Sequence, residues 1–390
     1  MRKSYKTEID PTPQQKIKIN KTIGTCRFIY NFFISHNKEI YETEKRYISE
    51  GEFRKWMNNE FIPNNEEYKW IKEAYSKAVT QSVKNADHAF KNFFNNGAGF
   101  PRYKKKNKSD VKMYFVKNNK KDCLCERHRI KIPTLGWVKI KEKGYIPTNQ
   151  VISSGAVSKR AGRYYVSVVV SDEAQDVKPL KELNDFGIGI DLGIKDFAVI
   201  SDGTVKKNIN KTAKMKKLEK KLKREQRSLS RKYEDFKKRN KEQKGEATRQ
   251  NIQKQVLKVQ KIHKRMDDIR TDYINKTINE IVKTKPSYIT IEDLKVTGMM
   301  KNKHLSKAVA AQKFYEFRIK LEAKCKENGI ELRIVDRWYP SSKMCNKCGN
   351  IKKDLKLSDR KYVCTCGHTA DRDYNASLNL RDAKTYKVAQ

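Results

Sequence analysis

Three acidic residues occupy positions from which they could act together on a phosphate. Asp191 ends an apolar segment and is followed by Leu-Gly, Glu292 ends a second apolar segment, and Asp373 lies at the beginning of an expected helix. A carboxylate at the end of a buried strand is costly unless a cation or a hydrogen-bond donor accompanies it, and hard divalent cations prefer oxygen ligands. We therefore predict that the three carboxylates converge on two Mg²⁺ ions, or on Mn²⁺ in their place.

Such a site would hydrolyse phosphodiester bonds. Two divalent ions bridged by carboxylates can activate a water and stabilise the leaving 3′ oxygen in an in-line displacement, and phosphoryl transfer depends mainly on metals and geometry. Taken singly, each acid is better explained as a helix N-cap or a strand-end surface residue, but the combination and order of the three favour a nuclease. Asp293 and Asp371 are local alternatives, and Asp371 could instead cap the helix that begins beside it.

Two pairs of cysteines have the spacing of a metal site. Cys345 and Cys348 form a C-x2-C pair, whereas Cys364 and Cys366 are one residue closer than is usual, with a short strand-like stretch between the pairs. Four thiolates at this spacing suit tetrahedral Zn²⁺ in a ribbon. The ion would be structural, because four protein ligands leave no open position. His368 is near enough in sequence to replace one thiolate.

The remaining cysteines give weaker signals. Cys26 and Cys325 lie in helical patterns and are predicted to be core residues. Cys123 and Cys125, with His128 nearby, could bind a metal ion, but an isolated C-x-C in a strand-rich region favours a structural role.

The charge of the chain indicates a polyanionic partner. Its 390 residues include 88 Lys and Arg against 46 Asp and Glu, for a formal net charge of +42. Self-repulsion of this size disfavours a compact state unless polyanions neutralise it, and nucleic acid is the obvious polyanion. A merely soluble basic protein is the alternative. A peripheral membrane protein fits less well, because no amphipathic anchor stands apart from the rest.

No targeting segment is recognisable. Residues 1–8 lack the apolar stretch of a secretory signal, and no run approaches the roughly 18 apolar residues of a membrane span. We expect an intracellular protein without a membrane partner, in which the eight cysteines are reduced or metal-bound rather than paired in disulfides.

Apolar patterning divides the N-terminal part into strands and helices. A short strand at residues 4–9 precedes a helical region, residues 11–106, and residues 111–171 carry β-branched and aromatic residues separated by Gly, Pro and Asn. The pattern predicts a β-barrel or sandwich, residues 1–10 and 107–180, with the helical part inserted after its first strand.

The C-terminal part combines apolar strands with helices. We predict a domain made of residues 181–340 and 369–390, interrupted by a ribbon at residues 341–368, and a single helix from about Ser306 to Asn328. The ribbon contains the four clustered cysteines.

A strongly basic helical hairpin is predicted at residues 211–283, with Gly245 in its turn. A solvated face explains most of its lysines individually, but we favour phosphate contact for the hairpin as a whole. Its apolar residues recur mostly at steps of three and four, which predicts a coiled-coil seam made of Met215, Leu218, Leu222, Leu229, Ile252, Val259, Ile262, Met266, Ile269 and Tyr273.

Several motifs together resemble the TnpB family of transposon-encoded RNA-guided nucleases. They are Gly-Ile-Asp-Leu-Gly at 189–193, Ile-Thr-Ile-Glu-Asp-Leu at 289–294, Trp-Tyr-Pro-Ser-Ser-Lys-Met-Cys-Asn-Lys-Cys-Gly at 338–349 and Cys-Gly-His-Thr-Ala-Asp-Arg-Asp-Tyr-Asn-Ala-Ser at 366–377. Residues 26–31, 90–94 and 99–101 are also similar to that family, so the resemblance spans nearly the whole chain.

The resemblance implies an α+β multidomain protein. Residues 1–10 and 107–180 would form a wedge-type β-barrel, with residues 11–106 as its helical recognition insert. Residues 181–340 and 369–390 would form an RNase H-like RuvC α/β domain, interrupted by the zinc ribbon.

The resemblance also implies a function. A guide RNA would direct cleavage of double-stranded target DNA beside a short transposon-adjacent motif, in the cytoplasm of a prokaryote and at its nucleoid. Asp373 would be the acid on the last helix. Lys77 and Gln81 would contact the adjacent motif, since their spacing puts both on one helix face. They could equally be ordinary exposed helix residues.

Two other functions remain open at this point. One is a structure-selective RuvC nuclease that needs no guide, and the other is an RNA-guided regulator that binds DNA without cutting. The presence of all three acids argues against the second. We predict no DNA strand joining, because no tyrosine or serine recombinase signature is present.

Overall fold

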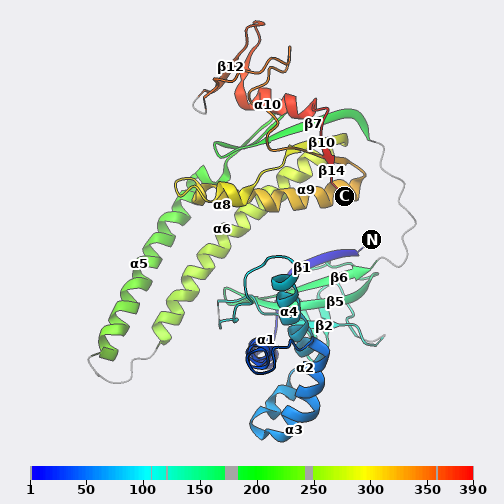
Figure 1. Ribbon diagram of the computed structural model, residues 1–390, viewed down its shortest axis with the longest axis vertical. Helices are drawn as coiled ribbons and strands as arrows, with labels where there is room; N and C mark the ends of the chain where they lie inside the picture. The colour runs from blue at the N-terminus through cyan, green and yellow to red at the C-terminus, as the bar shows by residue number, and fades with distance from the viewer. Residues whose placement is uncertain are drawn as a thin grey trace. The chain divides into compact units, whose positions relative to one another are not determined.

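Alternating apolar residues build one large sheet in each of two units (Figure 1). The computed structural model describes residues 2–106, 108–119, 122–171, 183–241, 249–356 and 359–389. The units are Met1–Asp176 and Val177–Gln390. The predicted domain boundary near residue 180 and the predicted hairpin turn at Gly245 lie outside the described residues.

The first unit contains an antiparallel sheet of six strands in the order β2-β5-β6-β1-β4-β3. Its first strand therefore lies between two strands that come more than a hundred residues later, as expected for an inserted helical part. The strands are β1 (Arg2–Asp10), β2 (Met113–Val116), β3 (Arg129–Ile132), β4 (Gly136–Ile140), β5 (Val151–Arg160) and β6 (Arg163–Ser171).

The helical part of this unit has its own apolar core, rich in Phe, Ile and Val. The first helix begins with a capping box, in which Thr12 and Gln15 each bond the other's backbone N–H. The elements are α1 (Pro13–Glu44), α2 (Glu50–Trp56), η1 (Met57–Phe61), α3 (Ile62–Asn64), η2 (Glu66–Glu73) and α4 (Ser76–Asn95). Residues 13–95 are thus mostly helical, within the range 11–106 given to the predicted insert.

The second unit contains a mixed sheet in the order β14-β11-β10-β7-β8-β9. The three central strands β11, β10 and β7 run parallel, and the outer pairings are antiparallel. The strands are β7 (Asn184–Leu192), β8 (Asp196–Ile200), β9 (Val205–Lys207), β10 (Pro286–Glu292), β11 (Glu331–Val335) and β14 (Lys387–Val388).

Helices cover both faces of this sheet (Figure 1). On one face, Ile188 and Ile190 of β7 join a core with the helices α6 (Gln250–Lys283) and α9 (Phe314–Asn328). On the other face lies the last helix, α10 (Arg372–Arg381), directly over Gly189. A Cβ on this glycine would lie 2.0 Å from the carbonyl oxygen of Ser377 and 2.4 Å from the backbone nitrogen of Arg381. Only glycine allows so close a contact between the helix and the strand.

The predicted basic hairpin consists of α5 (Ala213–Lys241) and α6, preceded by the short η3 (Ile209–Lys211). Its predicted seam is confirmed at the end near the sheet, where Met215, Leu218, Ile262 and Met266 are buried together, with Leu222 and Ile269 packed against them. Farther along, buried Gln255 donates hydrogen bonds to the side chain and the backbone carbonyl of Glu225.

The single helix predicted from Ser306 to Asn328 is wrong. It is two helices, α8 (Ser306–Gln312) and α9, because Lys313 adopts a left-handed conformation with φ of 57°. The Lys313 ammonium bonds Asp267, Thr271 and Glu316, which offsets the strain of that conformation. Ser306 is also not the N-cap, since that position belongs to Leu305.

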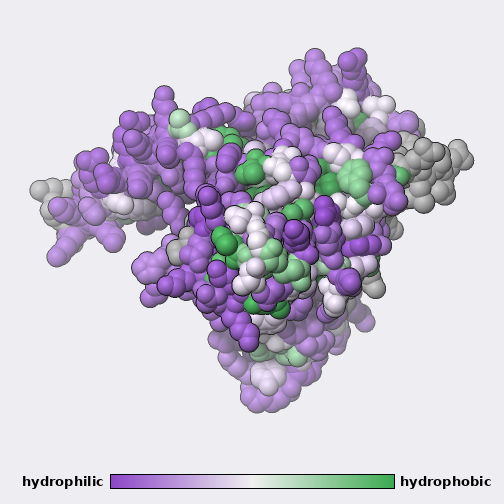
Figure 2. Space-filling model, turned by 90° about the horizontal axis from the view of Figure 1, so that it is seen from above, coloured by the Kyte–Doolittle hydropathy of each residue, from purple (hydrophilic) through white to green (hydrophobic). Residues whose placement is uncertain are grey.

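The ribbon that precedes α10 contains one small hairpin, β12 (Lys361–Val363) with β13 (Thr369–Asp371). A short helix, α7 (Val296–Met299), follows β10. Within the described residues, no helix is both long and apolar enough to cross a membrane. The face drawn in Figure 2 is mostly hydrophilic, with small hydrophobic patches.

Substitution at Gly189 tests the packing of α10 on the sheet. We expect Gly189→Ala to lower the free energy of unfolding by about 1–3 kcal/mol or more, because the methyl group overlaps helix backbone that cannot turn aside. Urea unfolding measures the change. Gly298→Ala is the control, since its Cβ would meet only the flexible side chain of Lys295 at 3.5 Å. Equal stability of the two variants would contradict the expected clash.

Candidate active site and metal centre

Two of the predicted acids lie at the same level on neighbouring strands. The parallel register pairs Ile190 of β7 with Ile291 of β10, and Asp191 and Glu292 are the residues that follow. Because side chains alternate along a strand, Asp191 shares the face of Gly189, on which α10 packs. Glu292 shares the face of Tyr288, whose hydroxyl donates to the carbonyl of Arg381 in α10. Both acids therefore face the layer that contains the last helix.

The third acid lies in the first turn of that helix. Ser377, four residues after Asp373, contacts the strand at Gly189, two residues before Asp191. Four helical residues rise about 6 Å and two strand residues about 6.6 Å, so the beginning of α10 can reach the level of Asp191. The charges of Asp373 and Glu292 do act on Asp191 in the folded chain.

Electrostatics at this site disfavour three bare carboxylates. Burial raises the pKa of Asp191 to about 8, and the charges of Glu292 and Asp373 add to the effect, while Arg372 opposes it. Burial also raises the pKa of Glu292, although a hydrogen bond from Ser341 opposes the shift. A bound cation would relieve the repulsion, and oxygen donors are the ligands that hard divalent ions prefer.

The two local alternatives have other partners. Asp293 bonds the guanidinium groups of Arg318, at 2.5 Å, and Arg337, at 3.4 Å. Asp371 is the N-cap of α10, and its carboxylate accepts from the backbone N–H groups of Asp373, at 2.9 Å, and Tyr374, at 3.2 Å. The capping role considered for Asp371 is thus confirmed.

Sequence reasoning missed the residues that hold the acids in place. The Ser341 hydroxyl donates to Glu292 Oε1 at 2.5 Å, and its carbonyl accepts from Asn379 of α10 at 2.7 Å. Asn375 bonds the Met344 carbonyl at 2.7 Å and accepts from the backbone of Asn346. The only sequence signal was a pair of asparagines four residues apart, on one face of the last helix.

The four predicted cysteines form one cluster. The sulfur atoms of Cys345, Cys348, Cys364 and Cys366 lie within 4.8 Å of one another, with 3.7 Å from Cys345 to Cys366 and 3.5 Å from Cys348 to Cys364. Four sulfurs at about 2.3 Å from one tetrahedral ion would be about 3.8 Å apart, so the cluster could hold zinc.

The pKa values of the thiols and the spacing of the second cysteine pair also bear on a metal site at this cluster. A hydrogen bond from the backbone of Cys366 lowers the pKa of the Cys364 thiol, which favours the thiolate that binds metal, whereas hydrogen bonds to the other three cysteines raise the pKa of Cys348. The shortened C-x-C pair does not prevent closure. His368, considered as a substitute, stands outside the four-residue group that the described residues form.

The other four cysteines are not part of the four-cysteine cluster. Cys26 and Cys325 are core residues, as predicted. Burial raises the pKa of Cys123 and of Cys125 to about 11 in each case, which disfavours the thiolate form.

Lys77 and Gln81 lie on α4, as the sequence suggested. Lys77 is exposed, and half-buried Gln81 donates a hydrogen bond to Asn85 at 3.1 Å. Neither points to a partner by itself, so their role stays a prediction.

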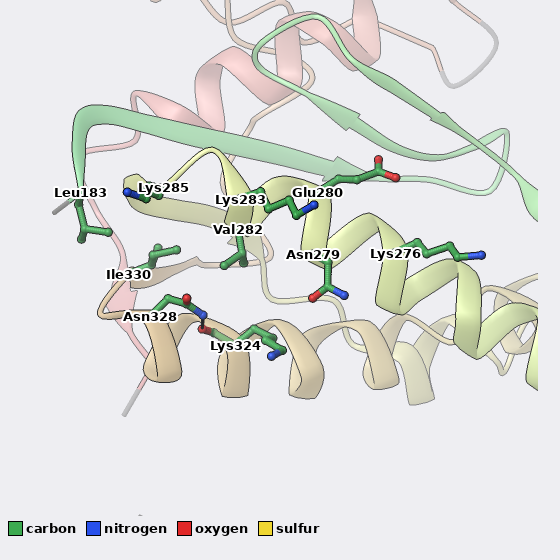
Figure 3. A pocket seen from close by; sticks show the side chains of 10 residues that line it. All are labelled: Leu183, Lys276, Asn279, Glu280, Val282, Lys283, Lys285, Lys324, Asn328 and Ile330. Atoms are coloured by element: carbon green, nitrogen blue, oxygen red, sulfur yellow. Dashed lines mark hydrogen bonds between the residues drawn. The ribbon is translucent and has the colours of Figure 1, made fainter. Parts of the chain in front are cut away.

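Lysine-rich surfaces occur elsewhere in the second unit. A groove along α5 is lined by Lys220, Lys223, Arg224, Gln226, Arg227, Ser230 and Arg231. A cleft of about 500 Å³ lies at the amino ends of β7 and β10, opposite the acids, between α6 and α9 (Figure 3). Four lysines line this cleft: Lys276, Lys283, Lys285 and Lys324.

Comparisons with known proteins agree with this fold. Family models match residues 1–46 ("Helix-turn-helix domain"), 166–303 ("Probable transposase") and 314–380 ("Cas12f1-like, TNB domain"). The structure of a Cas12f1-sgRNA-target DNA complex is similar in fold, with a TM-score of 0.60 and 16% identity over 96% of this chain and 83% of that one. The chain is therefore of the Cas12f1-like, transposase-related class.

Sequence relatives define the family more closely. The chain is 31% identical to "Putative RNA-guided DNA endonuclease InsQ" of Escherichia coli (strain K12), over 97% of this chain and 91% of that protein. It is 28% identical to a "Putative RNA-guided DNA endonuclease" of Streptomyces pristinaespiralis, over 97% and 89%. The chain belongs to the TnpB family, as its motifs predicted.

The raised pKa of Asp191 predicts a pH-dependent stability of the metal-free protein. The folded state keeps this proton up to a pKa of about 8, whereas an unfolded Asp loses it near pH 3.9. The contribution to stability is therefore complete below about pH 4 and is lost as the pH rises through about 8. In urea unfolding with EDTA, stability should fall less from about pH 5 to pH 8 in Asp191→Asn than in the wild type.

Asp382→Asn is the matched control for this slope. A hydrogen bond from Arg381 lowers the pKa of Asp382. Removing the Asp382 carboxylate should therefore not reduce the loss of stability between about pH 5 and pH 8. Identical slopes in the wild type and Asp191→Asn would show that Asp191 titrates normally.

The cysteine cluster predicts a zinc-dependent ribbon. We expect Cys345→Ser to lose most of the bound zinc, from about one ion per chain, because one of four tetrahedral ligands is removed. Elemental analysis of the purified protein measures the ratio. Cys125→Ser, in the other unit, should keep its zinc. Retained zinc in Cys345→Ser would refute the ligand assignment.

Proposed function

We propose that this chain is an RNA-guided DNA endonuclease that cuts target DNA next to a short adjacent motif. The observation that carries the proposal is the placement of Asp191 and Glu292 at the ends of neighbouring strands, with Asp373 in the first turn of the helix packed on them, near enough for the charges of Glu292 and Asp373 to act on Asp191. The names of two relatives that match it over most of their length support RNA guidance. The net charge of +42 supports a nucleic-acid partner.

The domain roles follow from the family. The strand order of the second unit, with three antiparallel strands followed by two parallel ones, supports an RNase H-like RuvC domain at residues 181–340 and 369–390. The ribbon at 341–368 would hold zinc. The first unit would supply the wedge domain, 1–10 and 107–180, and the recognition insert, 11–106.

The three acids suit divalent ions by their chemistry, since they are oxygen donors and the charges of Glu292 and Asp373 act on Asp191. The oxygen atoms of the three do not all lie within 4.8 Å of one another, as the four cysteine sulfurs do, so the ions would have to draw them together. Bound Mg²⁺ or Mn²⁺ would supply an activated water and stabilise charge on the phosphate. Asp191, Glu292 and Asp373 would hold the ions. Ser341 fixes the orientation of Glu292 by its hydrogen bond, and α10 fixes the position of Asp373 through its packing on Gly189.

Guide RNA and target double-stranded DNA would be the partners. The guide reads sequence by base pairing, while the protein reads heteroduplex shape and the adjacent motif. Lys77 and Gln81 of α4 would contact that motif. The protein would act in the cytoplasm of a prokaryote. The basic faces of α5 and α6 would contact phosphates.

Two other functions would give different results. A nuclease without a guide would cut branched DNA in the absence of RNA, and a guided regulator would bind the target and leave it intact. The burial of Asp191 and Glu292 beside each other argues against the regulator, because two neighbouring buried carboxylates are costly in a protein that binds no cation there.

Purification with the native flanking DNA tests the proposal. We expect a discrete RNA from the end of the locus to co-purify, and the complex to cut a matching target only with Mg²⁺ or Mn²⁺. Asp191→Ala should lower cutting by at least about a thousandfold, since one metal ligand is lost, while RNA and target binding stay near the wild type.

Sequencing of the bound RNA, gel assays of cutting and binding assays give the readouts. Asp202→Ala, an exposed turn residue of the same unit, is the control and should cut normally. Cutting without RNA would favour the guide-independent nuclease. Normal cutting by Asp191→Ala would refute the acid assignment.

A further inference from the structure

A single tryptophan stands out on the surface of the second unit. Trp338 is 85% exposed, more than any other large hydrophobic residue among those described. It lies in the loop between β11 and the ribbon, followed by half-buried Tyr339. Exposing the apolar surface of an indole to water costs free energy. A binding partner that covers the side chain would recover this free energy.

The loop that carries Trp338 is attached at both ends to an acid of the cluster. Before it, Val335 of β11 pairs with Glu292 in the parallel register. After it, the hydroxyl of Ser341 donates to the carboxylate of Glu292 at 2.5 Å. Trp338 is three residues from each attachment, so its Cα lies no more than about 11 Å from either Cα.

Hydrogen bonds also fix the shape of this loop. The Asp336 carboxylate accepts from the backbone N–H of Trp338 at 2.9 Å, and the Asp336 carbonyl accepts from that of Tyr339 at 3.0 Å. The Tyr339 hydroxyl donates to the carbonyl of Asn379 in α10 at 3.1 Å. These hydrogen bonds fix the backbone of the loop that carries the indole.

We propose that Trp338 is a stacking surface for a base of an unpaired DNA strand that enters the acid cluster. The inference rests on the proposed function and names its substrate form. Aromatic faces stack on bases of single strands without regard to sequence, whereas the faces of bases inside a duplex are covered by their neighbours. Arg337, beside it, adds a positive charge to the same loop and bonds Asp293 at 3.4 Å.

The position of the indole has a consequence for where the strand is cut. The reach of about 11 Å from Trp338 to the Cα atoms of Val335 and Ser341 corresponds to roughly three nucleotides at about 3.4 Å per stacked nucleotide. A base held on Trp338 would fix the register of the strand on the loop that contacts Glu292. Trp338 would thus be a substrate-binding residue that sets the cut position.

Three variants of Trp338 separate stacking from other roles. Trp338→Phe keeps a flat ring, Trp338→Leu keeps apolar bulk without one, and Trp338→Ala keeps neither. In the RNA-loaded protein we expect Ala and Leu to raise KM roughly tenfold and to scatter the cut positions, with kcat little changed. Phe should stay within about threefold of the wild type. Tyr315→Ala, another exposed aromatic residue of this unit, is the control.

A binding assay separates this inference from the proposed function. In the Asp191→Asn background, a single-stranded oligonucleotide containing 2-aminopurine should change fluorescence on binding, and Trp338→Ala should abolish the change. If the wild type cuts no DNA but this signal depends on Trp338, stacking stands and the endonuclease proposal falls. If it cuts but Leu matches Phe, or the signal persists in Trp338→Ala, the stacking role is refuted.

Discussion

The close packing of α10 on β7 at Gly189 is the contact on which the candidate site depends. A helix backbone cannot come this near to a strand that carries a side chain at the contact point, because a Cβ on Gly189 would lie only 2.0 Å from the Ser377 carbonyl oxygen. The contact sets the level of the helix along the strand. Through that level it sets the distance from Asp373, one turn earlier, to Asp191, two strand residues later.

The repulsion among the acids is opposed by Arg372 but not removed, because the pKa of Asp191 stays raised. The pKa of Asp191 near 8 reflects burial first and the neighbouring carboxylates second. Arg372, the cation acting on it, also bonds backbone carbonyls of Lys356 and Asp359. Asp293, by contrast, bonds two guanidinium groups, those of Arg318 and Arg337. Arg372 lies 3.7 Å from a carboxylate oxygen of Asp373 and is the cation that acts on Asp191, so the positive charge at the three acids is smaller than their negative charge.

The sequence predicted what depends on short-range pattern. Alternation identified β7 and β10 and their terminal acids, and cysteine spacing identified the cluster. It did not predict the break at Lys313, because the contacts that stabilise its left-handed conformation come from Asp267 and Thr271, more than forty residues away. Ser341 was missed for the same reason, since its partner Glu292 lies forty-nine positions earlier in the chain.

The cysteine cluster and the acid cluster are mechanically linked. Asn375 and Asn379 of α10 bond the Met344 carbonyl, one residue before the first cysteine, and Asn379 also bonds the Ser341 carbonyl. All of these bonds are buried or half-buried, where an unpaired amide is costly. A metal ion that orders the ribbon would therefore also hold the segment that positions Glu292 and the helix that carries Asp373. In this arrangement a structural ion would contribute to the candidate active site without touching it, and this gives a physical reason for a ribbon inserted between two of the three acids.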